Sequence, residues 1–204
     1  MRIFAVGRNY VEHIEELKNE RPDEPVIFTK PDTALLKNNA PFYHPDFSKD
    51  IHHEVELVLR ISKEGKSIDE KFAMSYVDAI GVGIDFTARD LQQKAKEKGL
   101  PWDIAKGFNG SAPISDKFIP VKDFKDFSNI NFKLEVDGKL KQAGNTKLML
   151  FPFSYIISYL TRFFTLRAGD LIFTGTPKGV SAVAIGNKLA AYIEDEKLLE
   201  FEVK

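Results

Sequence analysis

The segment 51–60 (IHHEVELVLR) constrains the fold more than any other part of the chain, because its residues alternate in polarity from Glu54 onward. Successive side chains of a β-strand point to opposite faces of the sheet. Glu54 and Glu56 therefore share one face, and a set of apolar residues shares the other. The apolar set is Val55, Leu57, Leu59 and Ile61. The pattern predicts a strand with one face in the core.

The two glutamates are unusual for such a strand. Glu54 and Glu56 would lie about 6.6 Å apart along it, where they repel each other by about 2.5 kcal/mol at an effective dielectric constant near 20. Glutamate is also depleted in strands. Two interpretations stay open at this point: a polar face in water, or a site in which a divalent cation lies between the carboxylates.

Composition limits the classes of function. The chain has 204 residues, 43% of them hydrophobic, with 17 phenylalanines, which indicates a folded core. Its 30 acidic and 29 basic residues give no overall field that would attract nucleic acid or an anionic membrane. The absence of cysteine excludes disulfides, thiolate metal sites and a cysteine nucleophile. With neither a signal-peptide pattern nor a long apolar run, we expect a cytoplasmic protein.

Many short strands and few short helices predict a single β-rich domain of mixed α+β class over residues 1–204. Asp137-Gly138 predicts a two-residue hairpin turn. Strands are expected at 3–6, 51–60, 77–86, 132–136, 139–142 and 170–174, with two more within 188–203 that are joined by a turn at Asp195-Glu196. Helices are expected at about 10–18, 69–76 and 88–98, and from Pro152 onward.

Residues 9–30 are expected to form a mobile lid. Asn9 and Glu12 resemble a capping box that opens a helix, and residues 19–25 form a polar loop with two prolines. On that helix, His13 and Glu16 are three residues apart and can touch. Two interpretations are open: a general base oriented by a carboxylate, or a partly buried histidine with a local salt bridge.

Asp85 follows two glycines on the same face of the predicted strand 77–86. Gly81 and Gly83 leave either open space or room for close approach of another backbone. Asp85 could cap the strand or the next helix instead of binding an ion. Together with Glu54 and Glu56, it would form an all-oxygen set that favours Mg²⁺, Mn²⁺ or Ca²⁺ over zinc.

Four further residues are candidates for substrate contact. Arg89 and Gln92 share a face of the helix at 88–98. Lys106 lies in a predicted Gly-flanked loop, where a cation could stabilise a carboxylate or an enolate, although a surface lysine is the alternative. Thr176 belongs to the turn 175–179 and could anchor a carboxylate. The remaining histidines are interpreted as structural or exposed: His44, His52 and His53.

In this order along the chain, the motifs resemble those of the fumarylacetoacetate hydrolase family, most closely its short acylpyruvate hydrolase and oxaloacetate decarboxylase branch. They are GRNYVEH (7–13), HHEVELVLRI (52–61), DFTARDLQ (85–92), AKGFNGSAP (105–113), GNT (144–146) and GDLIFTGTPKGV (169–180). The chain departs from the family pattern at Ala168, Asn109 and Gly110, and the last two are assigned no metal contact.

The resemblance implies a β-sandwich roll, a homodimer, and Mg²⁺ or Mn²⁺ as cofactor, with Ca²⁺ possible in crystals. Carried over residue by residue, it implies three roles. The metal ligands are Glu54, Glu56 and Asp85; the catalytic residues are His13, Glu16 and Lys106; and the substrate-binding residues are Arg89, Gln92 and Thr176.

The implied activity is metal-dependent hydrolysis of the C–C bond of acylpyruvates, small 2-oxo acids, with decarboxylation of oxaloacetate as a further reaction. Two alternatives stay open. One is an isomerase of the 2-hydroxyhepta-2,4-diene-1,7-dioate type, which breaks no C–C bond. The other is a catalytically inert domain that binds a metal or ligand.

Overall fold

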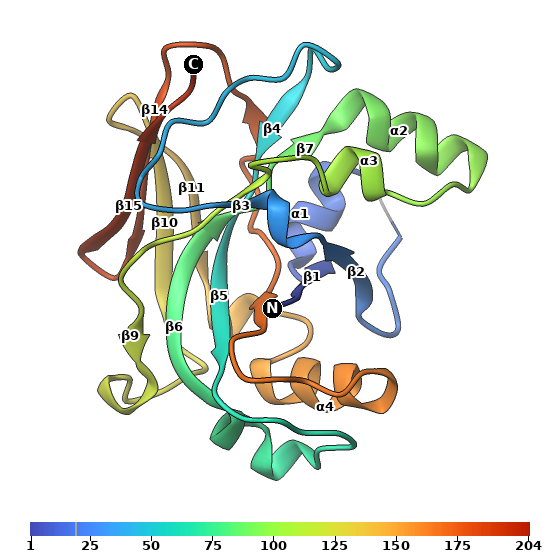
Figure 1. Ribbon diagram of the computed structural model, residues 1–204, viewed down its shortest axis with the longest axis vertical. Helices are drawn as coiled ribbons and strands as arrows, with labels where there is room; N and C mark the ends of the chain where they lie inside the picture. The colour runs from blue at the N-terminus through green and yellow to red at the C-terminus, as the bar shows by residue number, and fades with distance from the viewer. Residues whose placement is uncertain (19) are drawn as a thin grey trace.

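Two β-sheets pack face to face in the computed structural model, which describes residues 1–18 and 20–204 (Figure 1). The larger sheet has the strand order β2 (Val26–Lys30), β1 (Ile3–Gly7), β12 (Leu171–Phe173), β5 (Val55–Ile61), β6 (Val77–Ile84) and β9 (Ile119–Pro120). The second sheet has the order β11 (Lys139–Asn145), β10 (Asn131–Val136), β14 (Lys188–Ile193) and β15 (Glu196–Glu202). Two small sheets complete the fold: β13 (Ser181–Ala182), β4 (Ile51–His53) and β7 (Thr87–Ala88), and β3 (Leu35–Leu36) with β8 (Ala112–Pro113).

The core lies between the two large sheets. Leu57 and Val82 of the larger sheet belong to the same buried cluster as Leu134 and Leu199 of the other. The predicted apolar set of the 51–60 segment lies in this cluster. The expected β-rich mixed α+β fold, with its packed sheets, is therefore confirmed.

Short helices lie at the ends and sides of the sheets (Figure 1). The α-helices are α1 (Val11–Glu16), α2 (Arg89–Lys98), α3 (Asp103–Lys106) and α4 (Phe153–Phe163). The 3₁₀ turns are η1 (Asp32–Ala34), η2 (Glu70–Tyr76), η3 (Val121–Asp123) and η4 (Thr146–Leu148). Gly99 ends α2 with φ +63°, as expected for a glycine C-cap. In the described part of the chain, no helix is long and apolar enough to cross a membrane.

The predicted capping box is wrong. Tyr10, not Asn9, precedes the first turn of α1, and the helix ends at Glu16, two residues before the predicted end. Asn9 is fully buried, and its amide instead donates to the carbonyl oxygens of Phe151 (3.1 Å) and Thr174 (2.8 Å). The side-chain oxygen Oδ1 of Asn9 accepts the Phe151 N–H at 2.8 Å. Asn9 therefore ties the end of β1 to the segment that follows β12. Of the predicted loop 19–25, Asn19 lies outside the described residues, and 20–25 contain neither helix nor strand.

Two predicted turns differ in accuracy. Asp137 and Gly138 have φ values of +52° and +72°, as a two-residue hairpin turn requires. The second turn falls at 194–195, one residue before the predicted position, since β14 ends at Ile193 and β15 begins at Glu196. Pro152 precedes α4 instead of occupying its first turn.

The strand pairing brings four distant segments to one edge of the larger sheet. β1 pairs with β12 in parallel, so both strands end at this edge. β5 is antiparallel to β12 and begins there, and β6 is antiparallel to β5 and ends there. The residues that follow β1, β12 and β6 therefore meet those that precede and open β5.

The glycines of β6 do not leave open space. A Cβ atom at Gly83 would lie 2.8 Å from the ring of Phe173 and 2.9 Å from the Pro113 carbonyl oxygen. One at Gly81 would lie 2.8 Å from the ring of Phe118. The alternative of open space beside Gly81 and Gly83 is therefore wrong, and the alternative of close approach by neighbouring segments is correct.

We predict that Gly83→Ala lowers the free energy of unfolding by about 1–3 kcal/mol, because the Pro113 carbonyl cannot move away cheaply. Gly7→Ala is the matched control, since its Cβ would meet atoms no closer than 3.6 Å. Urea denaturation followed by circular dichroism measures both. Equal stability of the two variants would contradict the packing described here.

Candidate active site

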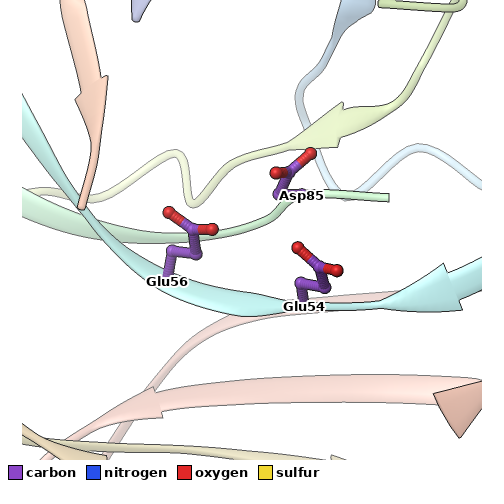
Figure 2. Close-up of side chains that lie close together, drawn as sticks. All are labelled: Glu54, Glu56 and Asp85. Atoms are coloured by element: carbon purple, nitrogen blue, oxygen red, sulfur yellow. The ribbon is translucent and has the colours of Figure 1, made fainter. Parts of the chain in front are cut away.

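The three predicted acidic residues lie together at the edge where the four segments meet (Figure 2). The backbone N–H of Asp85 donates to the Glu54 carbonyl at 2.8 Å, and Glu56 is paired with Gly83 on the neighbouring strand. Carboxylate oxygens of all three acids lie within 4.8 Å of one another. The acids are 1–4% exposed, so the interpretation as a polar face in water is wrong.

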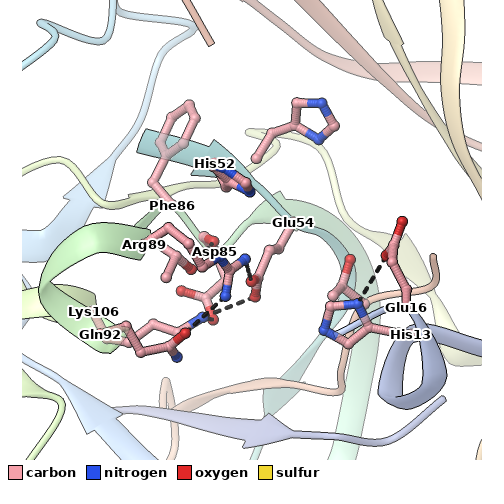
Figure 3. Close-up of polar contacts among 12 residues, drawn as sticks. His13, Glu16, His52, Glu54, Asp85, Phe86, Arg89, Gln92 and Lys106 are labelled. Atoms are coloured by element: carbon pink, nitrogen blue, oxygen red, sulfur yellow. Dashed lines mark hydrogen bonds and ion pairs between the residues drawn. The ribbon is translucent and has the colours of Figure 1, made fainter. Parts of the chain in front are cut away.

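Cationic side chains surround the acids (Figure 3). Lys106 Nζ donates to Glu54 Oε2 at 2.8 Å and to Asp85 Oδ2 at 2.7 Å. Arg89 donates to the other oxygen of Glu54. Lys30 Nζ lies 2.6 Å from Asp85 Oδ1. The three acids are thus matched in number by three buried or nearly buried cations.

The position of Lys106 corrects one expectation. Lys106 is the last residue of the short helix α3, not part of a loop, and it is 3% exposed. The surface interpretation is therefore wrong. Although burial disfavours its charge, Asp85 and Glu54 raise the pKa of Lys106, so that it remains an ammonium group.

Lys30 was missed by the sequence analysis. Its Nζ contacts the hydroxyl and the carbonyl oxygen of Ser111, both at 3.1 Å, and donates to the carbonyl of Lys106. It thereby holds the end of α3 against Asp85. Nothing near Lys30 in the sequence points to this role, because its partners lie more than fifty residues away.

The acidic cluster can accommodate a cation. Among the described residues, the buried Asp85 Oδ1 has the ion pair with Lys30 at 2.6 Å and no further hydrogen-bond partner. Glu56 accepts one backbone N–H, from Gly175 at 2.6 Å, which leaves its other oxygen open. An ionised carboxylate has about four acceptor positions, so the lysine contacts do not exhaust them. The donor set is all oxygen, as Mg²⁺ and Mn²⁺ prefer.

The environments of two of these acids differ. Burial opposes ionisation of Glu54, but Lys106 and Arg89 outweigh it and hold the pKa of Glu54 well below its usual range. Burial and the negative charge of Asp85 raise the pKa of Glu56 well above its usual range. The cluster therefore carries one acid that is difficult to ionise, first because it is buried and second because Asp85 lies close to it.

A cavity of about 30 Å³ borders the acids, with room for an ion or about two water molecules. We call it the carboxylate cavity. Every predicted site residue except Glu16 lines it: His13, Glu54, Glu56, Asp85, Arg89, Gln92, Lys106 and Thr176. Asn109, which was assigned no role, is exposed.

His13 reaches the carboxylate cavity from α1 (Figure 3). Its Nδ1 lies 3.5 Å from Glu16 Oε2, an ion-pair distance that does not make a hydrogen bond. Glu16 is held from the other side by the Gly179 N–H, at 3.1 and 3.2 Å from its two oxygens. Burial lowers the pKa of His13, so the ring is neutral at neutral pH and able to accept a proton.

Arg89 and Gln92 lie on one face of α2, as predicted. Arg89 Nη1 donates to Gln92 Oε1 at 2.7 Å, while its other nitrogen contacts Glu54. Gln92 is 4% exposed, although α2 as a whole is polar. The pair therefore forms part of the cavity wall instead of the solvent-facing side of the helix.

The side-chain amide of Gln142 is hydrogen-bonded to the Thr176 hydroxyl. Gln142 accepts the Val55 N–H at 3.0 Å and contacts His53 Nδ1 at 2.8 Å through Oε1. Its Nε2 then donates to Thr176 Oγ1 at 2.8 Å and to the Pro177 carbonyl at 2.9 Å. Oγ1 accepts from Gln142 and itself donates to the Pro177 carbonyl at 3.5 Å, a long contact that an acceptor in the cavity could replace. Gln142 was not among the predicted site residues. His53, interpreted as structural or exposed, is buried and contacts Gln142 and Ser181.

Comparison with known proteins gives the family. Residues 2–204 match the family model described as fumarylacetoacetate (FAA) hydrolase C-terminal. The chain is 42% identical over 202 residues to the mitochondrial oxaloacetate tautomerase of mouse, covering 99% of this chain and 91% of that protein. It is 48% identical over 186 residues to the mitochondrial oxaloacetate decarboxylase of Dictyostelium discoideum, covering 91% and 85%.

Solved structures show the same fold. A fumarylpyruvate hydrolase from Pseudomonas aeruginosa, in complex with Mn²⁺ and pyruvate, superposes with a TM-score of 0.93 and 36% identity. The match covers all of this chain and 89% of that one. These relatives are enzymes. The chain belongs to the fumarylacetoacetate hydrolase family.

Proposed function

We propose that the protein is a divalent-metal-dependent enzyme that acts on 2-oxo acids. The observation that carries the proposal is the meeting of a neutral histidine, a buried ammonium group and three acids in one cavity. The Mn²⁺ and pyruvate in the Pseudomonas relative support it, since pyruvate is itself a 2-oxo acid. We further propose that α1 moves to admit substrate, because the carboxylate cavity is smaller than such an acid. The two ends of the predicted lid are held in place, Asn9 by hydrogen bonds and Val26–Lys30 by pairing with β1.

Glu54, Glu56 and Asp85 would hold Mg²⁺ or Mn²⁺ at the floor of the cavity. When bound, the cation would supply a Lewis acid that polarises the C2 carbonyl of the substrate and favours negative charge on its oxygen. Lys106 would contribute a positive charge on the same side, and the Thr176 hydroxyl would donate a hydrogen bond to a substrate carboxylate oxygen in place of the Pro177 carbonyl.

The first candidate reaction is hydrolysis of an acylpyruvate. His13 takes a proton from water, and the resulting hydroxide attacks the C4 carbonyl. The C3–C4 bond then breaks, its electron pair passes to C3, and the acyl group leaves as a carboxylic acid. Lys106 stabilises the negative charge on the pyruvate enolate, which takes up a proton at C3 to give pyruvate. Glu16 keeps the ring of His13 oriented.

The second candidate is a reaction of oxaloacetate, and the names of the mouse and Dictyostelium relatives favour it. In tautomerisation, His13 removes a proton from C3 and a proton returns to the C2 oxygen, with no bond between carbons broken. In decarboxylation, the C3–C4 bond breaks with loss of CO₂, and no water or base is required. The same cavity would thus serve each reaction through an enolate oxygen near Lys106.

A substrate panel tests the proposed function. Acetylpyruvate, fumarylpyruvate, oxaloacetate and 2-hydroxyhepta-2,4-diene-1,7-dioate are incubated with Mg²⁺, Mn²⁺ or a chelator, and products are identified by NMR. We expect turnover of at least one acid that is lost with the chelator. An isomerase of the 2-hydroxyhepta-2,4-diene-1,7-dioate type would instead convert only the matching diacid without cleavage. Metal binding without any turnover would favour an inert binding domain.

We predict that His13→Ala lowers the rate of acylpyruvate hydrolysis by about 10²- to 10⁴-fold, the usual contribution of a general base. Oxaloacetate decarboxylation should fall much less, because it requires no base. His44→Ala is the control, since that ring lies outside the carboxylate cavity. Small and equal losses in both reactions would contradict the role of His13.

We predict that Mn²⁺ at about 100 times its dissociation constant stabilises the wild type by about 2.7 kcal/mol. Glu56→Gln should remove most of that stabilisation together with the metal-dependent activity. Glu64→Gln replaces an exposed glutamate and should respond as the wild type does. Differential scanning calorimetry with and without Mn²⁺ measures the shift, and an unchanged shift in Glu56→Gln would refute the assignment of Glu56.

A further inference from the structure

Two basic residues in the wall of the carboxylate cavity have no part in the reactions above. Arg8 follows β1 and Lys96 lies near the end of α2, and both line the cavity. Neither residue was predicted to belong to the site. Their presence raises the question of what a second group of positive charges does beside a metal site.

Arg8 has an unsatisfied polar atom. In the described part of the structure, its Nε is buried and has no hydrogen-bond partner. A buried guanidinium N–H without a partner costs stability, and a ligand oxygen in the cavity would remove that cost. Arg8 is only partly exposed, and its backbone has φ +59°, which is uncommon for a residue with a side chain.

Lys96 lies close enough to Arg8 for their positive charges to interact. It is on the same face of α2 as Arg89 and Gln92, at helical spacing of i, i+3 and i+7. Burial and the positive charges of Arg8 and Arg89 lower the pKa of Lys96 to about 8. Like charges held this close repel each other, and a bound anion would offset the repulsion.

The charge balance of the cavity indicates the charge of the ligand. Lys30, Lys106 and Arg89 already match the three acids in number. A divalent cation would therefore leave two positive charges in excess, and the guanidinium of Arg8 adds a third. A ligand with a single carboxylate leaves most of that excess unbalanced, whereas a dianion reduces it further.

The part of the cavity wall between Lys106 and Lys96 is apolar and suited to a carbon chain. Phe28 and Trp102 pack edge to face, with ring centroids 5.9 Å apart, and both line the cavity. Val6 and Leu17 line it as well. Lys96 Nζ lies 5.7 Å from the centroid of the Trp102 ring, so the apolar wall leads to the second cationic group.

We propose that Arg8 and Lys96 bind the second carboxylate of a 2-oxo dicarboxylate, so that the protein selects dianionic substrates over acylpyruvates with an uncharged end. This inference rests on the proposed function, because it takes the first carboxylate and the C2 oxygen to bind at Glu54, Glu56 and Asp85. Oxaloacetate and fumarylpyruvate carry the required second carboxylate, and acetylpyruvate does not.

The test compares two acids of equal chain length that differ only at the far end. 2-Oxoglutarate ends in a carboxylate, and 2-oxopentanoate ends in a methyl group. Their binding to the Mn²⁺-loaded protein is measured by titration calorimetry for the wild type, Arg8→Gln, Lys96→Met and the double variant. Arg8→Lys keeps the charge, and Lys98→Met removes an exposed lysine of the same helix as the matched control.

We expect the wild type and Lys98→Met to bind 2-oxoglutarate at least about tenfold more tightly than 2-oxopentanoate, the strength of a charged hydrogen bond. The preference should fall to about twofold or less in the double variant, while affinity for 2-oxopentanoate stays within about threefold. Arg8→Lys should retain most of the preference, which would separate loss of charge from loss of folding.

Absence of a preference in the wild type, or an unchanged preference in the double variant, would overturn the inference. Binding of neither acid would overturn it together with the proposed metal-dependent function. A clear preference without turnover in the substrate panel would support the second-carboxylate site while refuting the proposed reactions, so the two failures are distinguishable.

Discussion

The structure depends on the balance of charge around three buried carboxylates. Glu54, Glu56 and Asp85 are taken out of water, which is strongly unfavourable for ions without partners. Lys106 and Lys30 offset part of that cost by contacts below 3 Å. The balance is complete in number but not in position, because within the described residues Glu56 has a hydrogen bond to a backbone N–H and no ion pair. A divalent cation beside Glu56 is the simplest completion of this arrangement.

Strand topology explains why these groups meet. The parallel pairing of β1 with β12 joins the first strand to one that lies far along the chain and directs both strands toward the same edge. Asn9 fixes that junction through hydrogen bonds to the segments after β12 and before α4. The antiparallel pairs β12–β5 and β5–β6 then add the acidic residues at the same edge. The candidate base and the acids therefore come together through backbone pairing and through the side-chain amide of Asn9.

The sequence predicts those features that depend on local pattern. The alternation of polar and apolar residues identified the core face of β5. The all-oxygen set of Glu54, Glu56 and Asp85 was predicted as a cluster, and the structure brings these residues together. Features that depend on partners distant in the chain could not be predicted in this way. Lys30 and Gln142 are examples, since their contacts come from segments whose adjacency only the fold provides. Asn9 shows a third case, in which a residue suited to capping satisfies other backbone groups instead.

The most direct test of the central claim is a crystal structure of the protein grown with Mn²⁺, with anomalous diffraction data collected at the manganese edge. The account predicts a single strong anomalous peak within bonding distance of oxygens from Glu54, Glu56 and Asp85, with Lys106 still in contact with the acids. A map with no peak there, and with the three acids held only by Lys30, Lys106 and Arg89, would contradict it.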